Sequence, residues 1–179
     1  MKTVTKISEV RVLVKEWKKE GLTIGLVPTM GFLHEGHQSL IERAAKENDR
    51  VIVSDFVNPT QFGEGEDLES YPRDMERDKE VCEKAGAHLI FHPSPEDMYA
   101  KDASAMVDMK GPITEELCGR TRHIHFRGVC TVVAKLFNIT TPDRAYFGQK
   151  DAQQLAVIRR MTRDLNFDIK IIGLSLIHI

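Results

Sequence analysis

The sequence predicts an α/β fold in which a parallel β-sheet is covered by helices on both faces. Short, continuously apolar segments alternate along the chain with longer segments whose apolar residues recur at helical spacing. The apolar segments lack the polar alternation that strands of a half-exposed sheet would show. Uninterrupted apolar strands between amphipathic helices are typical of a parallel sheet buried on both sides.

The first half of the chain gives the most regular alternation. A helix is expected up to residue 20, because apolar residues recur there every three or four positions and Gly21 follows. The next strand ends at Pro28, which cannot continue a ladder of backbone hydrogen bonds. A later, strongly charged helix ends at Gly86. The expected elements are helix 7–20, strand 23–27, helix 36–46, strand 50–54, helix 73–85 and strand 87–91.

The second half is less regular. Pro93 and Pro95 predict a loop, and residues 104–109 are expected to form a short strand. The segment 126–138 reads as a buried helix, because its apolar residues fall on one face. The remaining expected elements are strand 144–147, helix 151–166 and strand 169–172.

Composition is that of a folded protein of one domain. The chain has 179 residues, of which 41% are hydrophobic and 29% charged, and its formal net charge is −2. Neither nucleic acid nor a membrane is therefore an expected partner. The three cysteines, Cys82, Cys118 and Cys130, include no CxxC pair, which favours reduced, buried thiols over disulfides or a zinc site. No signal peptide or membrane-length apolar run is found, so a cytoplasmic location is expected.

Three segments directly follow expected strands and carry the candidate functional residues. In a parallel sheet covered by helices, ligands bind beyond the carboxyl ends of the strands. Residues 28–37, 56–63 and 148–151 should all lie at that edge.

Residues 28–37, with the sequence PTMGFLHEGH, favour a phosphate site. His34 and His37 lie three positions apart at the start of the second helix, so they share a face. The unpaired N–H groups and positive dipole of a helix N-terminus suit an anion, and two imidazoles add further donors. An isolated HxxH would read as a surface pair. Its place after a strand instead favours a triphosphate site that stabilises charge as pyrophosphate departs.

Neutral amides characterise the second segment. Asn58 and Gln61 stand on a loop held by Pro59. Such groups can bind a hydroxyl or a carboxylate without the desolvation cost of a charge. Taken alone, the motif also reads as an ordinary turn, since Asn, Pro and Gly dominate turns.

The third segment and a basic cluster offer positive charge. Lys150 can neutralise a phosphate, and Asp151 can cap the following helix or accept from a ligand. A plain helix cap with a solvated lysine is the alternative. The basic cluster suits a phosphate or carboxylate ligand, or else a salt-bridged surface turn. It comprises Arg120, Arg122, His123, His125 and Arg127.

Five motifs together make the chain resemble the pantothenate synthetase (pantoate–β-alanine ligase) family. They occur in order and in frame from about residue 3 to Gly173. The motifs are residues 28–37, 56–63, 71–73, 125–129, and 142–151 with Gln153-Gln154. The resemblance implies a Rossmann-like domain of the HIGH-type nucleotidyltransferase superfamily, and a homodimer.

The resemblance also implies a reaction of coenzyme A biosynthesis. Pantoate, β-alanine and ATP, accompanied by Mg²⁺, would give pantothenate, AMP and pyrophosphate. The pantoate carboxylate would attack the α-phosphate to form pantoyl adenylate, and the amine of β-alanine would then displace AMP. Because no covalent enzyme intermediate is implied, catalysis would consist of positioning and charge stabilisation.

Residue roles follow from the resemblance position by position. His37 would be the proton donor, His34 would assist at the phosphates, and Lys150 would complete the catalytic set. Gln61 would contact both pantoate and β-alanine. The implied substrate-binding residues are Gln61, Gln154, Asn58, Tyr71 and Arg122. The residues implied to contact ATP are Met30, Gly31, Phe32, Leu33, His34, Glu35, Gly36, His37, Gly148, Gln149, Lys150 and Asp151.

The sequence departs from the family at two positions and at its end. His123-Ile124 replace a frequent Pro-Gly, and Asp55 replaces an apolar residue, so a buried Asp55 needs a partner. After residue 173 the family continues with a Ser-Ser-Arg-Asn segment and a smaller C-terminal domain. We expect residues 1–173 to form the ATP- and pantoate-binding domain and residues 174–179 to be a non-family tail. The chain alone is then expected to bind ATP weakly and to synthesise little pantothenate.

Two other functions compete with this interpretation. A nucleotidyltransferase of the same superfold could act on a phosphorylated alcohol, as phosphopantetheine adenylyltransferases do. A non-catalytic dimerisation or nucleotide-sensing module is the second alternative. Binding of pantoate, and pyrophosphate exchange that depends on it, would separate both from a pantoate-activating enzyme.

Overall fold

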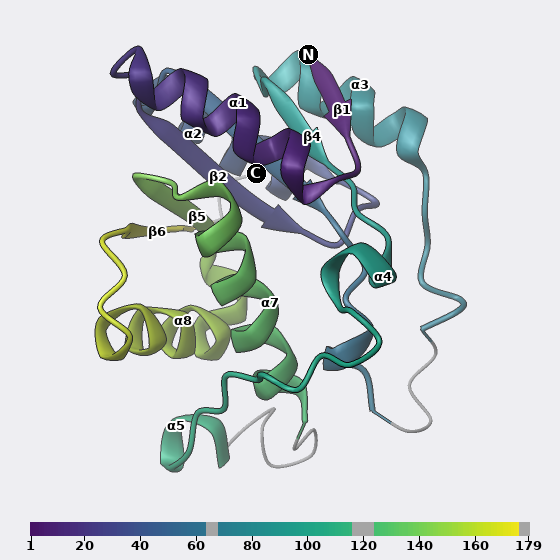
Figure 1. The fold of residues 1–179 in the computed structure, drawn as a ribbon, viewed down its shortest axis with the longest axis vertical. Helices are drawn as coiled ribbons and strands as arrows, with labels where there is room; N and C mark the ends of the chain where they lie inside the picture. Colours follow the sequence, from purple (N-terminus) through teal and green to yellow (C-terminus); the bar gives the residue numbers. More distant parts are fainter. Residues whose placement is uncertain (64–67, 116–123, 176–179) are drawn as a thin grey trace.

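In the computed structural model, which describes residues 1–63, 68–115 and 124–175, six strands form one parallel sheet (Figure 1). The strand order is β1-β4-β3-β2-β5-β6, and every neighbouring pair is parallel. The strands are β1 Lys2–Val4, β2 Ile24–Thr29, β3 Arg50–Asp55, β4 Leu89–Phe91, β5 Arg144–Gly148 and β6 Lys170–Leu174.

The chain reverses its direction of travel across the sheet at β2. From β2 it moves outward to β3 and β4, and it then returns to place β5 and β6 on the other side of β2. The register of the central pair joins Gly25 to Arg144 and Leu26 to Ala145. Such a reversal between two neighbouring strands opens a crevice at their carboxyl ends, where doubly wound proteins bind ligands.

Helices cover both faces of this sheet (Figure 1). One face packs against α1, α7 and α8 through strand residues such as Leu26 and Phe147. The other packs against α2 and α3 through Val27 and Tyr146. The helices are α1 Ile7–Lys19, α2 Glu35–Glu47, α3 Met75–Ala85, α4 Pro95–Met98, α5 Pro112–Glu115, α7 His125–Thr140 and α8 Ala152–Asp164, with 3₁₀ turns η1 Pro59–Gln61 and η2 Gln149–Asp151.

The alternation of strand residues explains why the apolar runs are unbroken. Successive side chains of a strand point to opposite faces. Leu26 therefore lies in one core and Val27 in the other, and both are fully buried. A sheet covered on one face only would have needed a polar residue at every second position.

The predicted parallel α/β fold is confirmed, with several differences in its elements. The strand predicted to end at Pro28 continues to Thr29, with Pro28 in register with Ser54 of β3. The short helix α4 begins at Pro95, where a loop was predicted.

The N-terminal strand β1 was not predicted; its three residues pair with β4. The strand predicted over residues 104–109 is wrong, because that segment has no regular structure. The backbone N–H of Val107 donates instead to Thr131 Oγ1 of α7, at 2.9 Å. A side chain of a helix thus takes the place of a partner strand.

Two of the three cysteines lie in the described part of the chain, and both are buried. Cys82 and Cys130 are buried free thiols, and burial raises the pKa of each to about 12. Cys118 lies outside the described residues. Among the helices that are described, none has the length and apolar character needed to cross a membrane.

Candidate active site

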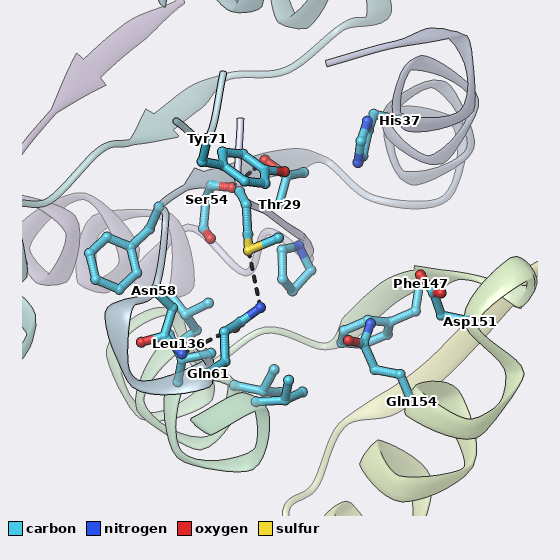
Figure 2. A pocket seen from close by; sticks show the side chains of 16 residues that line it. Thr29, His37, Ser54, Asn58, Gln61, Tyr71, Leu136, Phe147, Asp151 and Gln154 are labelled. Atoms are coloured by element: carbon cyan, nitrogen blue, oxygen red, sulfur yellow. Dashed lines mark hydrogen bonds between the residues drawn. The ribbon is translucent and has the colours of Figure 1, made fainter. Parts of the chain in front are cut away.

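A pocket of about 180 Å³ lies at the carboxyl ends of β2, β3 and β5 (Figure 2). Its walls come from the segments that follow these strands and from helices α2, α7 and α8. It is the crevice expected at the reversal between β2 and β5. The lining residues are Pro28, Thr29, Met30, His37, Ser54, Phe56, Asn58, Gln61, Tyr71, Val129, Val132, Val133, Leu136, Phe147, Asp151 and Gln154.

Seven of the predicted site residues meet in this pocket. They are Met30, His37, Asn58, Gln61, Tyr71, Asp151 and Gln154. The other described candidates lie outside its lining, namely Gly31, Phe32, Leu33, His34, Glu35, Gly36, Gly148, Gln149 and Lys150. Arg122, with Arg120 and His123 of the basic cluster, lies outside the described residues. Sequence alone does not distinguish the apolar floor from α7 from ordinary core, because pocket floor and core have the same residue types.

The two histidines are held at the start of α2 by backbone N–H groups. His34 is the N-cap residue, and its Nδ1 accepts from the Gly36 N–H at 3.0 Å. His37 Nδ1 accepts from the His34 N–H at 3.3 Å, and the two ring centroids are 4.1 Å apart. Because both Nδ1 atoms accept, each neutral ring carries its proton on Nε2. The pair therefore offers two Nε2–H donors.

His37 is a neutral donor at neutral pH. Burial, and secondarily the charge of His34, lower the pKa of His37 to about 4. Removing a cation from water disfavours its charged form, which is why burial acts in this direction. His37 can therefore donate a hydrogen bond to an anion while remaining uncharged.

Asp78 of α3 fixes the loop between β2 and α2, a role that no sequence pattern indicates. Its carboxylate accepts from the Phe32 N–H at 2.7 Å and from the Leu33 N–H at 2.6 Å. Asp78 is only 1% exposed, and burial raises the pKa of its carboxyl despite these two bonds. Gly31 and Phe32 both have positive φ, 79° and 51°. The two N–H groups thus hold a bent loop in place and do not face the pocket.

Asp55 lies beneath the same loop and has the partner that its burial demands. His92 Nδ1 is 3.7 Å from Asp55 Oδ1 and 2.8 Å from the Asp55 carbonyl oxygen. The Asp55 side chain raises the pKa of His92. The expectation of a partner is confirmed. A side chain at Gly31 would collide with the Asp55 carboxylate, so this position requires glycine.

The amides of Asn58 and Gln61 are linked to each other and to α7. Asn58 Nδ2 donates to Gln61 Oε1 and to the Gly128 carbonyl, each at 3.1 Å. Gln61 Nε2 lies 3.1 Å from Met30 Sδ across the pocket (Figure 2). Gly128 allows this contact, because a Cβ there would strike the backbone of residues 60–61. The Asn58 amide therefore holds the Gln61 side chain in place.

The opposite side of the pocket, residues 148–154, is built differently. Lys150 is exposed, and it has no hydrogen bond or ion pair with any other residue in the described ranges. Asp151 is the N-cap residue of α8 but makes no side-chain capping bond, and its side chain lines the pocket. Gln154 follows in the first turn of α8 and faces the same space (Figure 2). This side offers a cation, a carboxylate and an amide.

The described residues contain no group of three or more His, Cys, Asp or Glu side chains that could hold a metal ion.

The arrangement suits a small polar acid beside a polyphosphate. The floor is apolar, while amides from Gln61 and Gln154 face the space above it. His37 lies on one side of this space, and the exposed Lys150 precedes the lining residue Asp151 on the other. Amides can bind carboxylate and hydroxyl oxygens, and an imidazole N–H or a lysine can bind phosphate.

Comparison with known proteins gives consistent matches over almost the whole chain. The family model described as pantoate-beta-alanine ligase matches residues 2–178. A pantothenate synthetase from Clostridium acetobutylicum is 66% identical over 178 residues, covering 99% of this chain and 63% of that protein. One from Enterococcus faecalis is 66% identical over 172 residues, covering 96% of this chain and 61% of that protein. The chain thus spans less than two thirds of the length of these relatives.

Solved structures agree with the sequence matches. The crystal structure of pantothenate synthetase from Thermus thermophilus superposes with a TM-score of 0.93 at 48% identity, covering 98% of this chain and 62% of that one. Pantoate-beta-alanine ligase from Francisella tularensis, complexed with beta-gamma ATP and beta-alanine, has a TM-score of 0.93 at 39% identity. That match covers 98% of this chain and 67% of the other.

Proposed function

Because this chain belongs to the pantoate–β-alanine ligase family, we propose that its pocket binds pantoate and ATP for the condensation of pantoate with β-alanine to pantothenate. The observation that carries the proposal is the pocket itself. It brings Met30, His37, Gln61 and Gln154, which are far apart in the sequence, to one crevice between β2 and β5. The ATP- and beta-alanine-bound ligase from Francisella tularensis shares this fold, which supports the same ligands here.

In the proposed reaction the pantoate carboxylate attacks the α-phosphate of ATP. Pantoyl adenylate and pyrophosphate form, and the amine of β-alanine then attacks the acyl carbon and releases AMP. Gln61 and Gln154 hold pantoate over the apolar floor of α7, so the carboxylate is presented toward the histidine rim. Because the two reactants are already held together, little further entropy is lost on reaching the transition state.

The phosphates would be met by donors of two kinds. His37 and His34 donate through Nε2–H, and we propose that the His37 hydrogen bond stabilises charge on the departing pyrophosphate while the ring keeps its proton. Lys150 neutralises developing charge as a point cation. Mg²⁺, bound through the phosphates, would further offset that charge. Because burial lowers the pKa of His37 to about 4, it acts at neutral pH as an uncharged donor.

Asn58 and Asp78 have supporting roles in this proposal. Asn58 lines the pocket, but its amide already bonds Gln61 and Gly128, so it acts on pantoate through Gln61. Asp78 fixes the loop that carries Met30 and leads to His34. Tyr71 lines the same wall, and Arg122 stays a predicted substrate contact.

We further propose that this chain alone has little activity. It spans 63% of the Clostridium acetobutylicum relative, and losing one donor to the transition state typically costs roughly 10²–10³ in rate. Residues 1–173 would form the ATP- and pantoate-binding domain. The assignment of residues 174–179 as a tail stays a prediction, and residues 176–179 lie outside the described ranges. A homodimer and a cytoplasmic location also stay proposals.

Calorimetry with separate additions of D-pantoate and ATP–Mg²⁺ tests the proposal. We expect saturable binding of pantoate to the 179-residue chain, and weaker binding of ATP. Binding of phosphopantetheine in place of pantoate would favour the phosphate-ester nucleotidyltransferase. Binding of ATP alone would favour a nucleotide sensor, and binding of neither would contradict a ligand role for the pocket.

A further inference from the structure

Tyr99, in the loop after α4, bonds to the amide that holds Gln61. Its hydroxyl donates to Asn58 Oδ1 at 2.8 Å. The ring packs 6.4 Å from Phe56 between centroids, and Lys135 of α7 places its Nζ 5.3 Å from the ring centroid. Tyr99 does not line the pocket. Its hydroxyl is nonetheless hydrogen-bonded to Asn58, which does line the pocket.

Backbone groups fix which atoms donate and which accept in this series of hydrogen bonds. Asn58 Oδ1 accepts from the Thr60 N–H at 3.3 Å, and Asn58 Nδ2 donates to the Gly128 carbonyl at 3.1 Å. An N–H can only donate and a carbonyl can only accept, so the Asn58 amide cannot be reversed without breaking both bonds. Tyr99 must then donate, since Asn58 Oδ1 has only acceptor capacity.

The same logic orients Gln61. Asn58 Nδ2 is a donor, so the Gln61 atom 3.1 Å from it must be the acceptor Oε1. The Gln61 Nε2 therefore faces the pocket, beside Met30 Sδ (Figure 2). A ligand atom at this point must be an acceptor oxygen, as in a carboxylate or hydroxyl.

We infer that Tyr99 is a positioning residue: its bond to Asn58 helps to hold the Gln61 amide in place, with its NH₂ group toward the pantoate oxygens. This inference rests on the proposed function for the identity of the ligand, but its geometry does not. Burial of the Tyr99 hydroxyl raises its pKa, so the phenol keeps the proton that it donates. Tyr99 reaches the pocket through Asn58 and Gln61, and its effect is expected to fall on pantoate, the ligand proposed for Gln61.

The test compares Tyr99→Phe with Tyr146→Phe in the 179-residue chain. Tyr146 is a matched control, because its hydroxyl is also buried and bonded, to Glu47 and Asn48, yet it does not line the pocket. Pantoate and ATP–Mg²⁺ dissociation constants are measured by calorimetry. The side-chain NH₂ signals of Asn58 and Gln61 are followed by ¹⁵N NMR without ligand.

Loss of one hydrogen bond corresponds to roughly a 3- to 10-fold change in affinity. Tyr99→Phe is expected to raise the dissociation constant of pantoate by about that factor and to shift both NH₂ signals. The dissociation constant of ATP–Mg²⁺ should stay within about twofold of its value in the unsubstituted chain. Tyr146→Phe is expected to change none of these. Unmoved NH₂ signals in Tyr99→Phe, or equal weakening of both ligands, would overturn the inference. If the unsubstituted chain binds no pantoate, the proposed function fails and the NH₂ signals alone decide the role of Tyr99.

Discussion

The two walls of the pocket are built on different principles. The packed wall, residues 28–33 and 58–61, is held by groups that lie outside the pocket, such as Asp78 and Gly128. The exposed wall, residues 148–154, has an exposed lysine and an N-cap without a side-chain capping bond. Substitutions on the packed wall should therefore change both stability and binding, while those on the exposed wall should change binding alone.

Gln61→Glu should have the largest effect, because it places a negative charge where the packed wall offers NH₂. Because pantoate is an anion, a carboxylate beside its oxygens costs several kcal/mol, and we expect pantoate affinity to fall by at least roughly 100-fold. Calorimetry measures the loss. Gln38→Glu makes the same chemical change on α2, outside the pocket lining, and should leave pantoate affinity unchanged. An unaffected pantoate constant in Gln61→Glu would mean that the packed wall does not bind the acid.

Asp78→Ala should be the most destabilising of the changes considered. It leaves the Phe32 and Leu33 N–H groups without their acceptor, which should lower the free energy of unfolding by about 3 kcal/mol. Urea unfolding measures this. The exposed Glu76 on the same helix provides the control, and Glu76→Ala should stay within about 0.5 kcal/mol of the unsubstituted chain. Similar values for the two variants would show that Asp78 does not support the loop.

Lys150→Ala should show most clearly how the exposed wall differs from the packed wall. Lys150 has no partner among the described residues, so unfolding should be unchanged within about 0.5 kcal/mol. ATP binding should weaken by roughly 3- to 10-fold at low salt, and less at high salt because the contact is exposed. Lys46→Ala, at the far end of α2, is the control. A loss of stability without a change in ATP affinity would show that Lys150 supports the fold and not ligand binding.

The smallest expected effect is a pH dependence from His37. Its pKa is lowered from 6.5 to about 4 in the folded chain. Between these values the unfolded chain binds more protons than the folded one, so stability should fall as the pH decreases from about 6.5 toward 4. NMR titration of the ring should show His37 neutral at about pH 6, and His37→Gln should make the stability slope shallower. Protonation of His37 near its ordinary pKa of 6.5 would contradict its buried, neutral state.

Sequence patterns could predict the order of the elements because each strand is buried on both faces and reads as an unbroken apolar run. They could also place 28–37, 56–63 and 148–151 at one edge, since all carboxyl ends of a parallel sheet lie there. The supports of the packed wall could not be predicted. Asp78 reads as one more charge on a strongly charged helix, and Tyr99 as a loop aromatic. Their roles depend on contacts 45 and 41 residues away in sequence.

The strand at 104–109 was wrongly predicted for the same reason: its contacts with distant residues are not visible in the sequence pattern. Its apolar residues are compatible with a strand, but pattern alone does not say what its backbone groups will meet. In the fold, Val107 meets a threonine of α7. The helix 125–140 shows the converse limit: its valines were assigned to the core, although Val129, Val132 and Val133 also form the pocket floor.

The most direct test of a pantoate site between β2 and β5 is to map D-pantoate onto the backbone amide signals of the unsubstituted chain by NMR titration. We predict shifts that saturate and that gather on residues of both walls and the floor, including Gln61, Val133 and Gln154. A second hollow, lined in part by Lys18, Phe137 and Phe167, lies elsewhere on the chain. Shifts confined to that hollow, or no saturable shifts at all, would contradict a pantoate site in the crevice.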